Sequence, residues 1–273
     1  MLLGRTPGRY AGGRARYNAG MLRWFRRRPR EVWRQWYLVY TRPEEPPGWL
    51  GELQSRSPLQ ATFYRREQAP TFFVPMPTHD PTTAAVLAEC RGVTQLMAAY
   101  RGDRQVFMEL ARFAFGLAST QAGVIASPPA ARTYFAPDWV PRLGAFALAA
   151  HISIHLVPEP PPGDGMWVHS HGLAQFGLPE VEARQVRAQF QQAARKLVLF
   201  AGDWMLEGER FGDSHTLEAP WNRGRWAIVR MVSDRQAPPD HRPGPPTLRF
   251  SDYDRAGRLP LPGLNDFLEG LGA

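Results

Sequence analysis

The alternation of hydrophobic and polar positions is clearest between Phe146 and Val157. A period of two residues is typical of a strand with one buried face. The strand pattern resumes at Met166–Ser170, after a loop of Pro, Glu, Gly and Asp residues at Pro158–Gly165. We therefore predict that the two strands are antiparallel neighbours. The alternating residues are Ile152, Ile154 and Leu156 on one face, and His151, Ser153 and His155 on the other.

Several other short segments combine β-branched or aromatic residues with flanking prolines or glycines, which is typical of strands. Val93–Tyr100 fits either a strand or the continuation of a helix, because periodicity alone does not separate the two. The segments that we predict as strands are Trp36–Thr41, Gln60–Arg65, Thr71–Val74, Ala122–Ala126 and Trp226–Val232.

Asp80 and Pro81 predict the start of a helix, because aspartate is a preferred N-cap residue and proline is favoured at the first helical position. We expect this helix to end at Glu89 or Cys90, with Gly92 as the residue that follows its C-cap. Cys90 lies at the apolar end of this segment. We therefore interpret it as a core residue and not as a nucleophile.

Three further helices are predicted along the chain. Asp103 is a second N-cap, and Arg104–Leu117 carries apolar residues at helical spacing. A long helix is expected to open at Pro179, with Gly208 past its end, and Pro262–Leu271 fits a short closing helix. The apolar stripe of the long helix would consist of Ala183, Val186, Phe190, Ala193, Leu197, Ala201 and Trp204.

These elements predict an α+β fold with a mixed or mainly antiparallel sheet flanked by two principal helices. The chain of 273 residues is long enough for one large domain or two modest ones. We expect a disordered basic segment at residues 1–30 and an α+β core at residues 31–208. Residues 209–273 would form a small C-terminal module or extend the same sheet.

The positive charge of the chain is concentrated at its N-terminus. The formal net charge is +8, yet residues 1–30 contain nine arginines and no acidic residue. The remaining chain is therefore close to neutral, and contact with nucleic acid is expected only through the N-terminal arginines. Met21 is an alternative start, because order is expected to begin just after it.

Cysteine use and hydropathy favour a cytoplasmic location. Cys90 is the only cysteine, so no intrachain disulfide can form. No run of 18 apolar residues predicts a transmembrane segment, and no apolar region follows the basic N-terminus as it would in a secretory signal. The heavy use of arginine, alanine, proline and glycine is typical of a GC-rich bacterial genome.

The densest group of polar candidates lies in Met166–Glu182. His169 and His171 would point to the same side of a strand, and Glu180 and Glu182 follow at the expected helix start. Neutral imidazoles and carboxylates suit Zn or another divalent first-row metal, and one carboxylate could instead serve as a general base. The neighbouring strand offers a third nitrogen, from His155 or His151, but the loop length does not fix the register.

A purely structural interpretation of the same residues is also open. Acidic residues in the first turn of a helix gain about 0.3–1 kcal/mol from the helix dipole, which would explain Glu180 and Glu182. His169 and His171 would then hydrogen-bond to the backbone of a tight turn around Gly172–Gly177.

The segment Trp167–Glu182 resembles the signature of an uncharacterised bacterial family, a domain of unknown function. Its sequence is Trp-Val-His-Ser-His-Gly-Leu-Ala-Gln-Phe-Gly-Leu-Pro-Glu-Val-Glu. In that family an aromatic and aliphatic strand leads into His-Thr/Ser-His-Gly-Leu, followed by Phe/Cys-Gly-x-Pro-Glu-x-Glu. A looser similarity extends back to about Asp80. The resemblance implies a soluble bacterial α+β protein and carries no established activity.

Two functions of different classes follow from these patterns. The first is a cytoplasmic binding or regulatory protein without chemistry of its own, whose partner is an unknown protein or small molecule. The alternative is a metal-dependent hydrolase centred on His169 and His171, with Glu180 and Glu182 as further ligands. Binding of a divalent metal separates the two.

Overall fold

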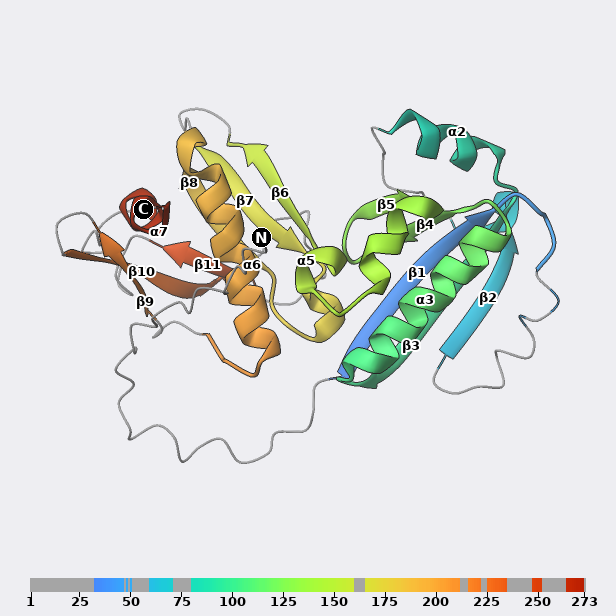
Figure 1. Ribbon diagram of the computed structural model, residues 1–273, viewed down its shortest axis with the longest axis horizontal. Helices are drawn as coiled ribbons and strands as arrows, with labels where there is room; N and C mark the ends of the chain where they lie inside the picture. The colour runs from blue at the N-terminus through green and yellow to red at the C-terminus, as the bar shows by residue number, and fades with distance from the viewer. Residues whose placement is uncertain are drawn as a thin grey trace, which may run out of the picture. The chain divides into compact units, whose positions relative to one another are not determined.

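The described residues form two β-sheets with helices packed against them, which confirms the α+β class (Figure 1). The computed structural model describes residues 32–46, 48, 50, 59–70, 80–159, 165–211, 216–221, 225–234, 247–251 and 264–272. The expectations for residues 1–30 and for a strand at Thr71–Val74 lie outside these ranges. Within them, no helix combines the length and the apolar character that crossing a bilayer requires.

The first sheet has the strand order β2-β3-β1-β4-β5, and every neighbouring pair is antiparallel. Its two longest strands, β1 and β3, pair over ten residues. The pairing of β3 settles the ambiguity at Val93–Tyr100 in favour of a strand. The strands are β1 (Val32–Thr41), β2 (Leu59–Arg65), β3 (Gly92–Arg101), β4 (Val124–Ser127) and β5 (Arg132–Phe135).

Strand β1 is buried on both faces. Tyr37 and Val39 belong to a core cluster shared with helix α3 (Arg104–Thr120). Leu38 and Tyr40 belong to a second cluster on the opposite face, shared with α2 (Pro81–Glu89). Apolar residues on both faces suit a strand that lies between two layers of helix.

Helices α2 and α3 begin where the sequence predicts. The Asp80 carboxylate accepts hydrogen bonds from the backbone N–H groups of Thr82 and Thr83, and that of Asp103 accepts one from Gln105. The expectation for Gly92 is wrong, because it is the first residue of β3 and not a helix-terminating glycine. The backbone is already extended at Cys90, so α2 ends without a left-handed residue.

The second sheet has the order β6-β7-β8-β11-β10-β9, with β8 and β11 parallel and the other pairs antiparallel. Residues after Gly208 therefore supply three strands to the sheet that contains β6, β7 and β8. The strands are β6 (Ser153–Pro158), β7 (Met166–His171), β8 (Val181–Val186), β9 (Thr216–Trp221), β10 (Arg225–Asp234) and β11 (Thr247–Ser251).

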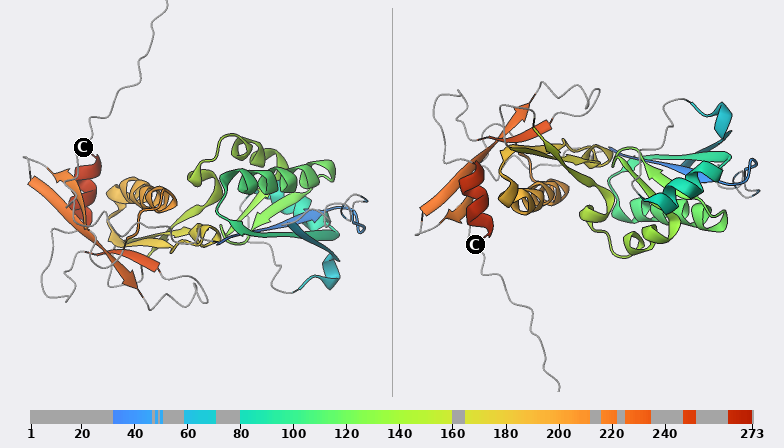
Figure 2. Two further views of the ribbon diagram at one scale, coloured as in Figure 1. Left: turned by 90° about the horizontal axis from the view of Figure 1, so that it is seen from below. Right: turned by 90° about the horizontal axis from the view of Figure 1, so that it is seen from above.

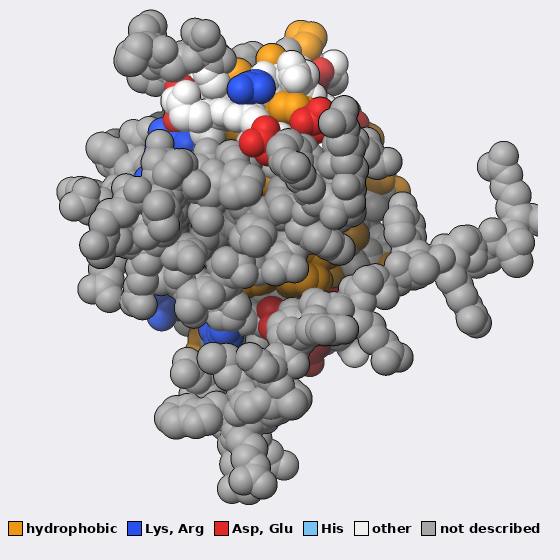
Figure 3. All heavy atoms as spheres, turned by 90° about the vertical axis from the view of Figure 1, so that its left-hand side faces the viewer, with side chains coloured by type: hydrophobic (Ala, Val, Ile, Leu, Met, Phe, Trp, Pro, Cys, Tyr) orange, Lys and Arg blue, Asp and Glu red, His pale blue; other side chains and the backbone are white. Residues whose placement is uncertain are grey.

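Helices α6 (Gln191–Leu206) and α7 (Leu264–Gly272) lie on one face of this sheet (Figure 2). The core beneath α6 includes Val168 of β7 and Val181 of β8. Figure 3 views the molecule from the left-hand side of Figure 1, and hydrophobic, acidic and basic side chains are intermixed among the described residues visible there. The residues that alternate with this core point to the other face of the sheet.

Two predicted elements are wrong in this half of the chain. The segment 179–187 is not the first part of a long helix: it contains β8, and α6 begins at Gln191. Gly172 and Gly177 adopt left-handed conformations around a 3₁₀ turn, which sends the chain back alongside β7. The predicted strand at 146–157 also begins late, because Leu148–His151 forms the one-turn helix α5 before β6.

An aromatic cluster joins the two sheets. Trp33 of β1 makes edge-to-face contacts with Phe107 of α3 at 6.1 Å and with Phe176 at 4.9 Å between ring centroids. The Phe146 ring lies 5.7 Å from that of Phe107. Pairs of this geometry stabilise a core beyond the area that they bury.

Candidate metal centre

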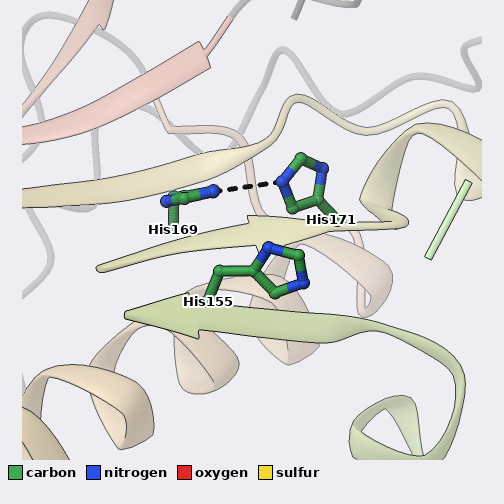
Figure 4. Close-up of side chains that lie close together, drawn as sticks. All are labelled: His155, His169 and His171. Carbon is green, nitrogen blue, oxygen red and sulfur yellow. Dashed lines mark hydrogen bonds between the residues drawn. The ribbon is translucent and has the colours of Figure 1, made fainter. Parts of the chain in front are cut away.

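Strands β6 and β7 bring three histidines together on the face of the second sheet opposite α6. His155 pairs directly with His169 across the two strands, and Ser153 pairs with His171. His169 and His171 are two residues apart on β7, so their side chains point to the same face. One imidazole nitrogen from each of the three histidines lies within 4.8 Å of the other two (Figure 4).

The distances between the three rings fit the binding of one metal ion. The Nε2 atoms of His169 and His171 lie 3.0 Å apart, and the His155 ring centroid is 4.6 Å from that of His171. In a tetrahedral site with Zn–N bonds of about 2.1 Å, ligand nitrogens lie about 3.4 Å apart. The His169–His171 pair already has nearly this separation, and the His155 nitrogen lies within 4.8 Å of both.

The short contact between His169 and His171 has the length of a hydrogen bond between the two rings. A ring N–H of one histidine donates to the bare nitrogen of the other, so a single proton lies between them. A bound metal ion would replace that proton, because both nitrogens must then present a lone pair.

Trp167 fixes the orientation of His169. The two rings are stacked, with centroids 3.8 Å apart and an angle of 26° between their planes. The indole Nε1–H donates a 2.8 Å hydrogen bond to Oε2 of Glu182, and the guanidinium of Arg184 lies 4.1 Å from the centre of the indole ring. The His169 side chain is only 3% exposed, so it has little freedom to leave this arrangement.

Glu182 is placed next to His169 but is engaged by other groups. It lies opposite His169 on β8 and is fully buried. Besides the Trp167 indole, its carboxylate accepts a 2.5 Å hydrogen bond from Nε of Arg249 and lies 3.4 Å from Nε of Arg184. Because Glu182 is on a strand, the expected helix-dipole explanation is wrong, and two guanidinium groups balance its charge instead.

Glu180 lies on the other side of β7, away from the histidines. Its carboxylate accepts hydrogen bonds from the Ser170 hydroxyl at 2.5 Å and from the backbone N–H groups of Gly172 at 2.9 Å and Ala174 at 3.1 Å. Burial raises its pKa above the usual value, while these hydrogen bonds oppose the shift. Glu180 therefore holds the turn between β7 and β8, and the expected place in a helix is wrong for it too.

His151 was the other candidate for a third nitrogen, and it is in a different environment from His155. It ends α5 and stacks on Phe146, with ring centroids 5.4 Å apart, while Phe107 contacts it edge-on at 4.8 Å. Within the described residues neither ring nitrogen has a hydrogen-bond partner. Burial, and then the positive charge of Arg142, lower its pKa to about 4, so it is neutral at pH 7.

The sequence analysis missed Trp167, Arg184 and Arg249 as parts of this site. The alternation along β7 places Trp167 on the same face as His169, so that residue could have been found. Arg184 was hidden by the assignment of β8 to a helix. Arg249 is 67 positions from Glu182, and only the parallel pairing of β8 with β11 brings them together.

Comparison of the chain with models of protein families, with curated proteins and with solved structures finds no match. The donor set itself consists of three imidazoles. Imidazole ligands suit Zn, Cu and Ni, whereas Mg and Ca prefer oxygen ligands.

Proposed function

We propose that the protein is a binding module for a divalent first-row transition metal, with Zn as the principal candidate. His155, His169 and His171 would hold the ion. The observation that carries this proposal is the convergence of three imidazole nitrogens within 4.8 Å from two paired strands. We leave Glu180 and Glu182 out of the proposed ligand set, because Glu180 accepts hydrogen bonds from the turn and Glu182 accepts one from the Trp167 indole.

The frame around the histidines favours tight binding. Strands β6 and β7 pair at six positions, and the other face of both strands contributes to the core beneath α6. His169 is held by Trp167, which is held in turn by Glu182. Groups of this kind behind a metal ligand typically improve affinity 10–100-fold, because they reduce the freedom lost on binding.

The test is a zinc titration of the full chain, purified without chelator and then stripped with EDTA and desalted. We expect one zinc ion per chain by calorimetry, and an increase in melting temperature with zinc. At a free zinc concentration 100 times the Kd, the expected stabilisation is about 2.7 kcal/mol.

Single substitutions of His155, His169 and His171 by alanine should each weaken zinc binding strongly. His151→Phe is the matched control, because it removes an imidazole that lies outside the cluster, between the rings of Phe107 and Phe146. Absence of zinc binding by the wild type, or equal binding by the wild type and His171→Ala, would contradict the proposal.

A further inference from the structure

The number of ligands in the histidine cluster distinguishes two kinds of metal site. Structural zinc sites are closed by four protein ligands, whereas catalytic zinc sites have three and keep one position for water or substrate. Within the described residues, the cluster contains three histidines and no fourth histidine, cysteine or carboxylate. The arrangement is therefore that of an open site.

Backbone pairing and core packing hold the strands around the cluster. His155 and His169 are already opposite each other in a continuous antiparallel pairing. On the other face of the sheet, Ile152 precedes β6 and Val168 lies in β7, and both are buried in the core. An ion would cross-link strands that hydrogen bonds and core packing already hold, so a purely structural role leaves the open position unexplained.

The groups around the cluster would leave the positive charge of a bound ion uncompensated. All three ligands are neutral imidazoles, and the nearby carboxylate of Glu182 is neutralised by Arg249 and Arg184. A doubly charged ion with three neutral ligands makes a bound water molecule much more acidic than free water, with a pKa near 7 in the best-known zinc sites.

The surroundings also indicate the kind of substrate. His155 and His171 are half-buried, and the side chains of Arg184 and Arg249 are 31% and 35% exposed. Two arginines, Arg184 and Arg249, are matched by two acids, Glu159 and Glu182. Among the described side chains, this balance leaves no net charge to select an ionic substrate, and the half-buried Trp167 ring beside His169 adds an apolar surface.

We infer that the metal centre hydrolyses small neutral esters. This inference rests on the proposed metal binding. An ion held by His155, His169 and His171 would supply an activated water, which would lose a proton to the buffer and add its oxygen to the carbonyl carbon of the ester. The bond from that carbon to the alcohol oxygen breaks, and the departing oxygen takes up a proton. Ester and water become acid and alcohol, with no further reactant.

The experiment measures hydrolysis of 4-nitrophenyl acetate by the full chain, stripped of metal and then titrated with zinc chloride. We expect the rate to exceed the sum of those of the stripped protein and free zinc by about tenfold or more, because a bound ion lowers the pKa of its water. The rate should reach its plateau at one zinc per chain. Its pH profile should show one ionisation near pH 7, which shifts when cobalt replaces zinc.

Variants keep the result specific to the cluster. His171→Ala and the milder His155→Asn should abolish the zinc-dependent rate, while His151→Phe, outside the cluster, should leave it unchanged. Melting in the presence of EDTA checks that each variant is folded, since the wild type and variants should then unfold at similar temperatures.

The two proposals fail in different ways. If calorimetry shows one zinc bound by the cluster and the rate does not rise, the hydrolytic inference is wrong and the binding function stands. A zinc-dependent rate that survives in both histidine variants also overturns the inference. If zinc does not bind the wild type, both are wrong.

Discussion

The two strands β1 and β7 occupy comparable places in their sheets, but β1 packs against apolar clusters on both faces and β7 on one. Each has a hydrogen-bonded strand on both sides. On β1, Tyr37 and Leu38 point to different faces, and each belongs to an apolar cluster. On β7, Val168 belongs to the core beneath α6, while His169 on the other face has Trp167 and histidines as neighbours.

This difference follows from where the helices pack. The first sheet lies between α2 and α3, so the β1 side chains from Tyr37 to Tyr40 fill space on both faces. Among the described helices, α6 and α7 pack on one face of the second sheet, and polar residues of neighbouring strands pair with one another on the other face (Figure 2). Buried polar side chains are stable when they are paired in this way. Substitutions should therefore affect stability on β1 and metal binding on the histidine face of β7.

The largest effect is expected from Tyr37→Ala on β1. The Tyr37 ring is buried against Trp139 at 5.4 Å between centroids, and its hydroxyl accepts a hydrogen bond from Gln35. Loss of a buried aromatic ring costs about 3–5 kcal/mol in the free energy of unfolding. Urea denaturation should give the same loss with and without zinc. A loss that depends on zinc would show that packing around β1 and metal binding on β7 are coupled.

A second effect separates His151 from the three clustered histidines. Its pKa is lowered to about 4 in the folded protein, against about 6.5 when unfolded, so the unfolded state takes up the proton first. The contribution of neutral His151 to the free energy of unfolding is complete above pH 6.5. It is lost as the pH falls towards 4, which lowers the free energy of unfolding by up to about 3 kcal/mol.

His151→Phe should remove this part of the pH dependence, because phenylalanine fits an aromatic environment and does not titrate. Unfolding free energies of the wild type and the variant, measured between pH 4 and 8, give the comparison. Parallel curves would mean that His151 can be protonated without leaving its place beside Phe146.

A smaller effect is expected from Trp167→Leu. The substitution removes the stacking on His169 and the hydrogen bond to Glu182, and we expect zinc affinity to fall about 10–100-fold. Trp167→Phe keeps an aromatic ring beside His169, so its zinc affinity should lie between those of Trp167→Leu and the wild type. The absorption spectrum of bound cobalt reports the ligand geometry and should change in Trp167→Leu. Trp204→Leu on α6 is the control, and an equal loss of zinc affinity there would contradict the assigned role of Trp167.

Local signals in the sequence predict local structure well. Asp80 and Asp103 mark helix starts because an N-cap is made by residues within one turn. His169 and His171 could be placed on one strand face from their spacing alone. The apolar residues of the segment 181–186 fit the period of a helix as well as that of a strand. Only the pairing of this segment with β7 and β11 shows that it is a strand.

The parts of the site that come from distant strands could not be predicted in the same way. The register that sets His155 opposite His169 depends on hydrogen bonds across β6 and β7, which loop length does not specify. The contact of Arg249 with Glu182 depends on a parallel pairing between segments far apart in the chain. Contacts of this kind carry no local pattern in the sequence.

The parallel pairing of β11 with β8 also has a consequence for synthesis of the chain. Glu182 is translated long before Arg249, so a growing chain that ends before Thr247 contains the buried carboxylate with Arg184 but without its second cationic partner. Burial of a charge without sufficient compensation is unfavourable. The histidine face can therefore reach its final electrostatic balance only after β11 has left the ribosome, which makes this site one of the last parts of the protein to mature.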